Sequence, residues 1–392
     1  TQFGAKGDGV TLNTVFIQKA IDQCPAGGTV LIPKGVFLSG ALFLKSHMTL
    51  LIDAGGELKG STNESDYRPF INNRFEGWEM KTYASLLNAG TMNRKGGFSV
   101  EQLSIRGEGT ITGGGTPLAN KMIEKDGLRS RGRLICLMNC RDVEIQGLQI
   151  RNSPCWTIHY IYSKGITCHD LNIVSTAHNG DGLDPDSSDD SYILNCTFST
   201  GDDCIAIKSG KNPEGFFVAK PTRNVRIADC NFIKGHGISI GSEMSGGVSD
   251  VLVQDCKAGN LLNGMQIKGT KERGGYVKNV TVADCQLLKI TVLTALNYNN
   301  DGDAAPEVPT FENYVFRNID LSKASPNETV MIINGFKGVP HHLKNLTFTD
   351  ITLPENGKIV ISDAEQAVFK NVKSVSGAKP QYAVTNCSDL TY

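Results

Sequence analysis

Short runs of alternating apolar and polar residues recur along the chain, and each run is followed by Asn, Asp or Gly. Alternation over about five residues, with many β-branched side chains, predicts strands rather than helices. The runs start roughly 22 to 40 residues apart, a period typical of solenoids, in which each repeat adds one coil. They begin at Leu103, Val143, Ile166, Tyr192, Val225, Val251, Val280, Tyr314, Leu346 and Val368.

One segment near the N-terminus has a different period. In 14–24, apolar residues such as Ile17 and Ile21 recur at helical spacing, and Asn13 precedes them as a candidate N-cap. The first coil of a solenoid leaves its core open to solvent, and a short amphipathic helix would cover that opening. We therefore expect a capping helix here, with a partner-binding helix as the alternative.

Together these patterns predict an all-β protein, a right-handed parallel β-helix with a short N-terminal capping helix. No linker or low-complexity stretch divides the sequence, so we expect a single domain over 1–392. Within it, 1–30 should hold the N-terminal strand and capping helix, and 100–375 the regular coils.

The dipeptide Asp-Cys or Asn-Cys recurs along the repeats. Residues in equivalent positions of successive coils stack on one another, so these cysteines are expected to form a buried column of small apolar side chains. Disulfides or metal ligands are the alternatives, although no Cys/His group has zinc spacing. The dipeptides end at Cys140, Cys196, Cys230, Cys256 and Cys285.

Composition narrows the possible functions. The chain has 39 basic and 40 acidic residues, with a formal net charge of -1, so no overall positive field favours nucleic acid or a membrane surface. An acidic substrate would therefore need a local positive site. The 11 cysteines are too sparse in 392 residues for a small disulfide scaffold.

The densest polar cluster lies in four pieces, at 179–184, 201–210, 235–238 and 264–268. Successive pieces are about one coil apart, which should place them on one wall of the solenoid, one rung above another. Because rungs are about 4.8 Å apart, four of them would line roughly 15 Å of groove, enough for a few sugar units.

Three carboxyl groups in this cluster suit the cleavage of a glycosidic bond. Asp202 and Asp203 share one rung and Asp181 lies on the next, and carboxylates so close cannot all ionise freely. One carboxylic acid can then protonate the leaving oxygen while an ionised neighbour activates water. His236 follows in register with them and is expected to have a catalytic or orienting role.

Other aspartates of the cluster have a simpler interpretation. Aspartate is common in tight turns because its side chain bonds to nearby backbone N–H groups. We expect Asp184, Asp186, Asp189 and Asp190 to close the turns between coils.

At these residues the sequence resembles the polygalacturonase family, family 28 of the glycoside hydrolases. That family has Asn-x-Asp, Gly-Asp-Asp-Cys, Gly-His-Gly and Arg-x-Lys in this order, and the first three occur at 179–181, 201–204 and 235–237. The N-terminal 3–9 is also similar. The resemblance covers nearly the whole chain, and the 201–210 stretch is its most specific part.

The resemblance implies hydrolysis of pectin by single displacement with inversion, with no cofactor and no metal. It implies that Asp202 is the general acid, that Asp181 and Asp203 activate water, and that His236 supports the acid. It also implies substrate-binding roles for Asn179, Gln266, Lys268 and, by a looser match, Tyr298. A one-rung separation of about 5 Å would by itself suggest retention, since inverting pairs usually lie roughly 6.5–9.5 Å apart.

The chain departs from the family at one position, where Gln266 replaces the arginine of Arg-x-Lys. Glutamine cannot make the paired, charged contact with a carboxylate that arginine makes, whereas Lys268 can still meet one as a point charge. Rhamnogalacturonan or a substituted pectin is therefore an alternative substrate to galacturonan. Arg273 could replace the missing arginine, but a solvated loop residue is the simpler interpretation.

The stretch 62–97, rich in Asn, Arg and aromatic residues, comes before the regular coils and could close one end of the groove. We therefore expect exo-action, with an ordinary N-terminal elaboration as the alternative.

Two functions of other kinds remain at this stage. A calcium-dependent pectate lyase would use the aspartates as a Ca²⁺ cage, but it needs an Arg or Lys base beside them. A non-catalytic carbohydrate-binding β-helix would not need acids in register on one wall.

The expected partner is an acidic plant cell-wall polysaccharide, with no nucleic acid and no membrane. The substrate class suggests a secreted or periplasmic location. The chain begins at Thr1 without a charged and apolar leader.

Overall fold

The computed structural model describes residues 2–293 and 302–392 and is built almost entirely of parallel strands. Its contacts divide it into two compact units, residues 1–204 (unit 1) and 205–392 (unit 2), and each is described by itself. The parallel strand pairs of both units confirm the predicted β-helix. The expectation of a single domain stays a prediction.

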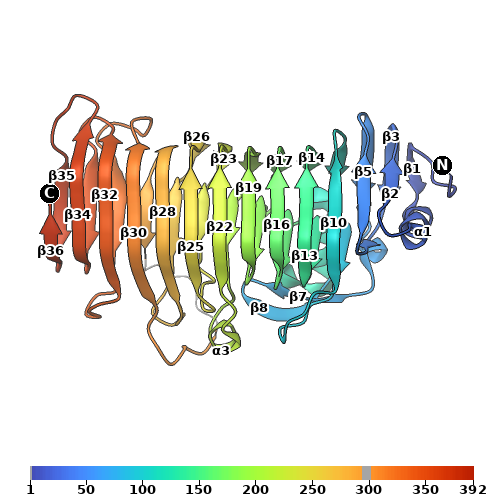
Figure 1. Cartoon of the computed structure of the whole chain (residues 1–392), viewed down its shortest axis with the longest axis horizontal. Coiled ribbons are helices and arrows are strands. Elements are labelled where there is room, and N and C mark those ends of the chain that lie inside the picture. Colours follow the sequence, from blue (N-terminus) through green and yellow to red (C-terminus); the bar gives the residue numbers. More distant parts are fainter. Residues whose placement is uncertain (1, 294–301) are drawn as a thin grey trace. The chain divides into compact units, whose positions relative to one another are not determined.

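Unit 1 contains two sets of parallel strands, which we call A1 and B1 (Figure 1). The strands of A1 are β1 (Asp8–Leu12), β2 (Gly28–Ile32), β3 (Gly35–Ser39), β5 (Met48–Ile52), β6 (Gly56–Gly60), β10 (Val100–Gly107), β11 (Thr110–Thr112), β13 (Cys140–Gln146), β14 (Gln149–Arg151), β16 (Lys164–His169), β17 (Asn172–Ser175), β19 (Asp189–Leu194) and β20 (Thr197–Thr200). The strands of B1 are β4 (Leu42–Leu44), β9 (Leu87–Gly90), β12 (Ile135–Met138), β15 (Ile158–Ile161) and β18 (Leu183–Asp186).

Unit 2 repeats the arrangement with sets that we call A2 and B2. The strands of A2 are β22 (Thr222–Ala228), β23 (Asn231–Gly235), β25 (Val248–Gln254), β26 (Lys257–Leu261), β28 (Tyr276–Gln286), β30 (Thr310–Asp320), β32 (Leu343–Leu353), β34 (Glu365–Ser374) and β36 (Ser388–Thr391). The strands of B2 are β21 (Ile205–Ile207), β24 (Ile238–Ile240), β27 (Met265–Lys268), β29 (Ile290–Leu293), β31 (Thr329–Asn334), β33 (Lys358–Ser362) and β35 (Gln381–Thr385). A short helix, α3 (Glu214–Val218), lies in the loop after β21.

The predicted apolar runs coincide with strands of A1 and A2, and their alternation sets the register. In unit 1, Leu103 pairs with Val143 and Val143 with Ile166, and all three side chains are buried. In unit 2, Phe316 and Phe348 lie in paired positions with their rings stacked 5.2 Å apart. A one-residue shift of any strand would turn its apolar side chains outward, so the sequence pattern fixes the pairing.

The polar residues directly before three runs of unit 2 occupy tight corners with a left-handed backbone. Asn279, Asn313 and Asn345 of unit 2 have φ of 57°, 63° and 57°, a conformation that Asn and Asp tolerate better than other non-glycine residues. Their amides also bond in a chain, because Asn313 Nδ2 donates to Asn279 Oδ1 at 3.1 Å and Asn345 Nδ2 to Asn313 Oδ1 at 3.0 Å. The corners are therefore held by polar ladders as well as by the core.

The five cysteines predicted to form one buried column are all buried, but they do not all occupy the same position in their coils. All 11 cysteines, each within the described residues, are free thiols, and within unit 2 Cys256 N–H donates to the sulfur of Cys285 at 3.4 Å. Cys196, Cys230 and Cys256 each follow the first strand of set A in their coil. Cys140 instead starts β13 and belongs to a different corner. The prediction failed there because the same dipeptide can occupy either corner of a coil.

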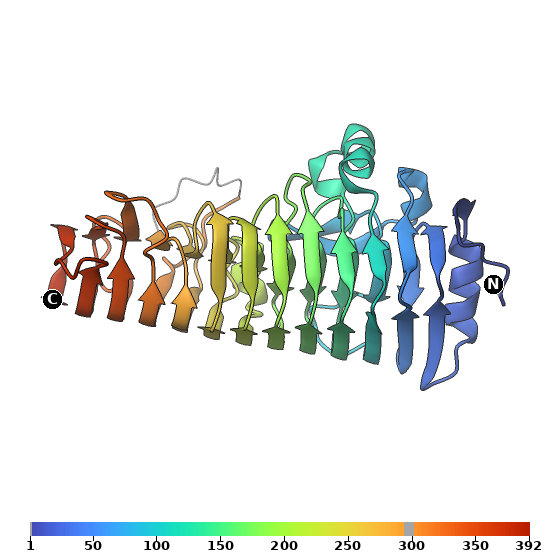
Figure 2. The ribbon, with the colours of Figure 1, turned by 90° about the horizontal axis from the view of Figure 1, so that it is seen from above.

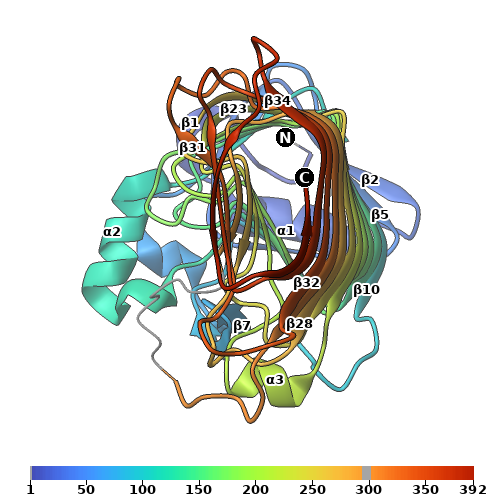
Figure 3. The ribbon, with the colours of Figure 1, turned by 90° about the vertical axis from the view of Figure 1, so that its left-hand side faces the viewer.

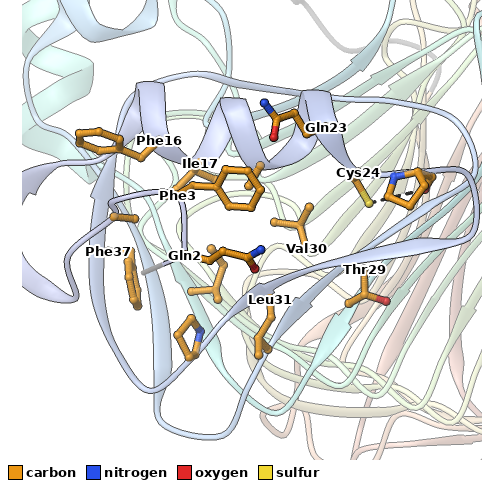
Figure 4. Close-up of a pocket in the computed structure, with 15 residues that line it drawn as sticks. Gln2, Phe3, Phe16, Ile17, Gln23, Cys24, Thr29, Val30, Leu31 and Phe37 are labelled. Atoms are coloured by element: carbon orange, nitrogen blue, oxygen red, sulfur yellow. Dashed lines mark hydrogen bonds between the residues drawn. The ribbon is translucent and has the colours of Figure 1, made fainter.

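The predicted capping helix is α1 (Thr14–Gln23), whose Ile17 and Ile21 are buried against unit 1. Asn13 precedes it but does not cap it through its side chain, which instead bonds to Lys6 and to the Thr11 and Leu38 carbonyls. Between α1 and β2 lies a cavity of 450 Å³ lined by apolar residues such as Phe3, shown in Figure 4.

An elaboration of unit 1 covers the outer side of B1. It contains η1 (Glu64–Tyr67), the antiparallel hairpin β7 (Ile71–Phe75) and β8 (Trp78–Thr82), α2 (Gly115–Asp126) and η2 (Leu128–Ser130). Within unit 1, α2 and β7 lie on the side away from β5 and β10 in the end-on view (Figure 3). The teal turns of α2 also project from the strands in Figure 2. Arg68 pairs with Asp126 at 2.9 Å and ties the segment before the hairpin to α2.

Candidate active site

The aspartates predicted for catalysis in unit 1 occupy neighbouring rungs beside B1. Gly182 N–H donates to the Asp203 carbonyl at 3.0 Å, so the backbone at Asp181 runs alongside that at Asp203. The side chains of Asp181 and Asp203 are each 3% exposed, and Asp202 is half-buried. The spacing of the sequence motifs thus brought these three residues to adjacent coils, as predicted.

A local turn fixes the Asp202-Asp203 pair. The N–H of Asp203 donates to Asp202 Oδ1 at 2.9 Å, and the Thr200 hydroxyl donates to the Asp202 carbonyl at 2.8 Å. One carboxylate oxygen of Asp202 is therefore engaged by the backbone of its neighbour. This arrangement orients Asp202 and Asp203 before any substrate binds.

The predicted residues of unit 2 that the structure describes lie on or beside β24 and β27. His236 is half-buried between β23 and β24. The following residue must be glycine, because Gly237 has a φ of 98° and a Cβ there would lie 2.3 Å from the Gly264 carbonyl oxygen. The Gly-His-Gly motif is therefore a backbone requirement as well as a candidate chemical group.

Gln266 and Lys268 lie on β27, and their side chains have different surroundings. Gln266 is 7% exposed, pairs in register with Ser239, and donates from Nε2 to the Ser239 hydroxyl at 3.3 Å. Lys268 ends the strand and is half-buried. Tyr298 lies outside the described residues.

Sequence reasoning missed a cluster of cations around one carboxylate in unit 2. Lys208 Nζ lies 3.5 Å from Glu243 Oε2. Burial raises the pKa of Glu243, but Lys208, Arg273 and Lys268 more than offset it and hold that pKa below its usual value. Three positively charged side chains surround one carboxylate, so the cluster has a net positive charge. Such a cluster is the local positive site that an acidic substrate requires.

The interpretation of Arg273 as a solvated loop residue is wrong. Its side chain is 1% exposed, its Nε donates to the Ser242 carbonyl at 2.8 Å, and its Nη1 donates to Asn212 Oδ1 at 2.5 Å. The Lys-Glu-Arg-Gly-Gly sequence looks hydrophilic, but the guanidinium is drawn inward by carbonyl and amide oxygens that lie far from it in sequence.

The turn-closing interpretation is also wrong for two aspartates of unit 1. Asp184 and Asp186 lie within β18 and are completely buried. Asp186 accepts a hydrogen bond from Arg74 Nη1 at 2.7 Å and lies 3.4 Å from His159 Nε2. Burial alone would raise the pKa of Asp186, but Arg74 and then His159 more than offset it and bring that pKa to about 2.

The ion pair of Asp186 attaches the β7–β8 hairpin to B1. Arg74 also donates to the Tyr162 hydroxyl at 2.6 Å, and Phe75 stacks on Trp156 with ring centroids 5.3 Å apart. At the turn, Glu76 pairs with Arg129 at 2.8 Å. The hairpin therefore lies across the outward face of β12, β15 and β18, where every residue is buried.

A parallel β-helix whose wall carries carboxyl groups on neighbouring rungs suits an enzyme that cleaves a long polysaccharide. The sequence profile described as "Glycosyl hydrolases family 28" matches residues 25–387, nearly the whole chain. The chain belongs to this family.

Similar proteins agree with this assignment. A probable polygalacturonase of Vitis vinifera is 30% identical, over 99% of this chain and 79% of its own length. An exo-poly-alpha-D-galacturonosidase of Dickeya chrysanthemi is 28% identical, over 95% of this chain and 70% of its own. The structure of the family 28 exopolygalacturonase of Yersinia enterocolitica matches with a TM-score of 0.88 and 26% identity, covering 99% of this chain and 77% of that one.

The protein is thus a polygalacturonase-like glycoside hydrolase, and its reaction is polygalacturonase-type hydrolysis of pectin. This membership argues against the calcium-dependent lyase and the non-catalytic binding protein. No helix in residues 2–293 or 302–392 is both long and apolar enough to cross a membrane.

Proposed function

We propose that this protein removes single galacturonic acid units from one end of a galacturonan chain, with inversion at the anomeric carbon. The observation that carries exo-action is the β7–β8 hairpin, which lies across B1 as far as β18, the strand that follows Asp181 in its coil. A groove that follows the strands of set B would be closed on that side. A chain end could then enter while the middle of a polymer could not.

The family relatives support this proposal without deciding it. The Dickeya chrysanthemi and Yersinia enterocolitica proteins are described as exo-acting, but an endo-polygalacturonase of Pectobacterium parmentieri is also 29% identical over 86% of this chain. Sequence identity near 30% is compatible with both modes of action. The hairpin is the feature of this chain that favours exo-action.

The proposed reaction is a single displacement. The carboxylic acid of Asp202 donates its proton to the glycosidic oxygen as the bond from that oxygen to the anomeric carbon breaks. Asp181 and Asp203 accept a proton from the water whose oxygen attacks the opposite face of that carbon. The products together carry one added water. His236 helps to keep Asp202 in the protonated form that the reaction needs.

Recognition of the sugar acid involves the cation cluster. Lys268 meets the galacturonate carboxylate as a point charge, and Lys208 and Arg273 keep the surroundings positive although Glu243 is among them. Asn179 and Gln266 contribute amide hydrogen bonds to the sugar. Because the substrate is a plant cell-wall polymer, we also infer that the protein acts outside the cytoplasm, as a secreted or periplasmic enzyme.

The decisive experiment follows the cleavage of a defined galacturonate oligomer by mass spectrometry and by proton NMR. We expect saturated products, release of monomer from the first turnover, and inversion of the newly formed anomeric centre. A mixture of short oligomers at early times would contradict exo-action, and retention would contradict single displacement. If the oligomer is not cleaved but rhamnogalacturonan or substituted pectin is, that polysaccharide is the substrate instead of galacturonan.

A first prediction concerns the departure at Gln266. We expect Gln266→Arg to lower KM for galacturonate oligomers by up to about tenfold, because a guanidinium adds a charged hydrogen bond to a carboxylate. Steady-state kinetics on wild type and variant provide the measurement. Gln266→Met is the control for loss of the bond to Ser239, and it should not lower KM. An arginine variant with unchanged KM would mean that the groove is reshaped elsewhere.

A further inference from the structure

Arg131 of unit 1 is a completely buried arginine between η2 and β12. Its Nε donates to the Leu128 carbonyl at 2.9 Å, its Nη1 to the His178 carbonyl at 2.6 Å, and its Nη2 to Asn179 Oδ1 at 2.7 Å. Nη1 also donates to the Pro154 carbonyl at 3.5 Å. All four acceptors are neutral, and no carboxylate of the described residues forms an ion pair with this guanidinium. Burial of a cation without a counter-charge costs several kcal/mol, so its retention calls for a role that the fold alone does not require.

The contacts of Arg131 converge on one short turn. His178 and Asn179 are consecutive, and Asn179 lies two residues before Asp181. Asn179 has a φ of 53°, a left-handed conformation that costs most residues energy, and its side chain is half-buried. The guanidinium therefore binds this turn twice, at the backbone carbonyl of His178 and at the side chain of Asn179.

The same contact fixes the direction of the Asn179 amide. A guanidinium has only donors, so the atom of Asn179 that faces Arg131 must be the carbonyl oxygen. The NH₂ group therefore points the other way, and within residues 2–293 and 302–392 it makes no hydrogen bond to the protein. Asn179 thus presents two N–H donors and no acceptor on its open side.

We propose that Arg131 is a positioning residue that holds Asn179 with its amide N–H groups towards an oxygen acceptor of the bound sugar. This inference rests on the proposed hydrolysis of galacturonan, whose units carry hydroxyl, ring and carboxylate oxygens. An Asn179 that could flip would offer its carbonyl oxygen half of the time and would repel a substrate carboxylate. The locked amide therefore offers its two N–H groups to an acceptor oxygen of the sugar and never places its own carbonyl oxygen against a substrate carboxylate.

The β7–β8 hairpin completes the support of Arg131. The Phe75 ring lies 5.3 Å from the Arg131 guanidinium carbon, and Arg133 Nη1 donates to the Arg131 carbonyl at 2.7 Å. The Arg133 guanidinium in turn lies over Phe75 and Trp156, at 4.6 Å and 4.4 Å. The hairpin that closes the groove thus also packs behind the residue that orients Asn179.

A double-mutant cycle on KM and kcat with a galacturonate oligomer tests the proposal. Loss of a hydrogen bond to a charged group costs about 1.5–3 kcal/mol, so we expect Arg131→Met to raise KM about ten- to a hundredfold, with a much smaller change in kcat. Asn179→Ala should raise KM by a similar factor. In the double variant, Arg131→Met should add no more than about a twofold effect, because no amide is left to orient.

Two further variants keep the test decisive. Arg131→Lys retains the charge on a single donor nitrogen, and we expect it to recover part of the loss. It replaces Arg131→Met in the cycle if the methionine variant does not fold. Arg141→Met removes a guanidinium of β13 that pairs with Glu101 and takes no part in the support of Arg131 or Asn179, and its KM should stay within about threefold of the wild type.

The outcomes separate the two proposals. Factors that multiply in the double variant, an unchanged KM in a folded Arg131→Met, or an equal loss in Arg141→Met would each overturn the role of Arg131. A wild type without turnover of galacturonate oligomers would instead overturn the proposed function, and the role of Arg131 with it.

Discussion

Replacing Asp202 or Asp203 with asparagine is expected to lower kcat by at least about a hundredfold while leaving the fold intact. Asparagine at 202 still offers Oδ1 to the N–H of Asp203, so the local turn should survive the change. It cannot donate a carboxylic acid proton to the glycosidic oxygen. Asparagine at 203 cannot accept a proton from the attacking water.

The measurement is the initial rate of reducing-end formation from a galacturonate oligomer, with the thermal unfolding midpoint as the check on folding. Asp190→Asn is the matched control, because this aspartate of β19 pairs with Lys164 at 3.5 Å and is not assigned to the reaction. Its rate should remain close to that of the wild type. A near-normal rate in Asp202→Asn or Asp203→Asn would remove that residue from its assigned role.

Asp186→Asn is expected to lower the free energy of unfolding by up to about 3–5 kcal/mol, because the buried Arg74 charge then keeps only Glu79, at 3.8 Å, as a counter-charge. Both side chains of the pair are only 1% exposed, so water cannot replace the lost carboxylate. The loss should appear as a lower denaturant midpoint. It should also appear as faster proteolytic cleavage within the β7–β8 hairpin, which Arg74 anchors.

The double variant Arg74→Met with Asp186→Leu shows whether the loss of stability in Asp186→Asn comes from the buried Arg74 charge or from poorer packing. Apolar residues of similar volume often replace a buried ion pair without loss of stability, so the double variant should regain most of the midpoint lost in Asp186→Asn. A single variant as stable as the wild type would mean that water reaches Arg74. A double variant less stable than the single one would mean that packing, rather than charge, holds the hairpin.

Much of the fold follows from local sequence because its contacts repeat with a short period. Each coil pairs with its neighbours in the same way, so the alternation around Leu103, Val143 and Ile166 was enough to predict parallel strands and their register. Asn and Asp at the corners reflect the left-handed backbone there. The capping helix was predicted to within one residue at its C-terminal end.

The candidate acids could be located for the same reason. Residues one repeat apart stack on one wall, so the spacing of Asp181 and Asp203 was sufficient to place them on adjacent rungs. The sequence also showed that Gln266 stands where the family pattern has an arginine. The roles of these residues stay predictions until the variants are measured.

The sequence by itself determined the coil, its corners and the order of the acids, because these depend on neighbours within one repeat. Only the tertiary structure decided what covers the wall, because the hairpin leaves the repeat and makes its contacts at long range. Arg74 meets Asp186, and Arg131 meets Asn179, across 112 and 48 residues of chain. No local pattern encodes such pairs, since a buried arginine and a solvated one have the same neighbours in sequence, and burial is settled only where distant segments pack together.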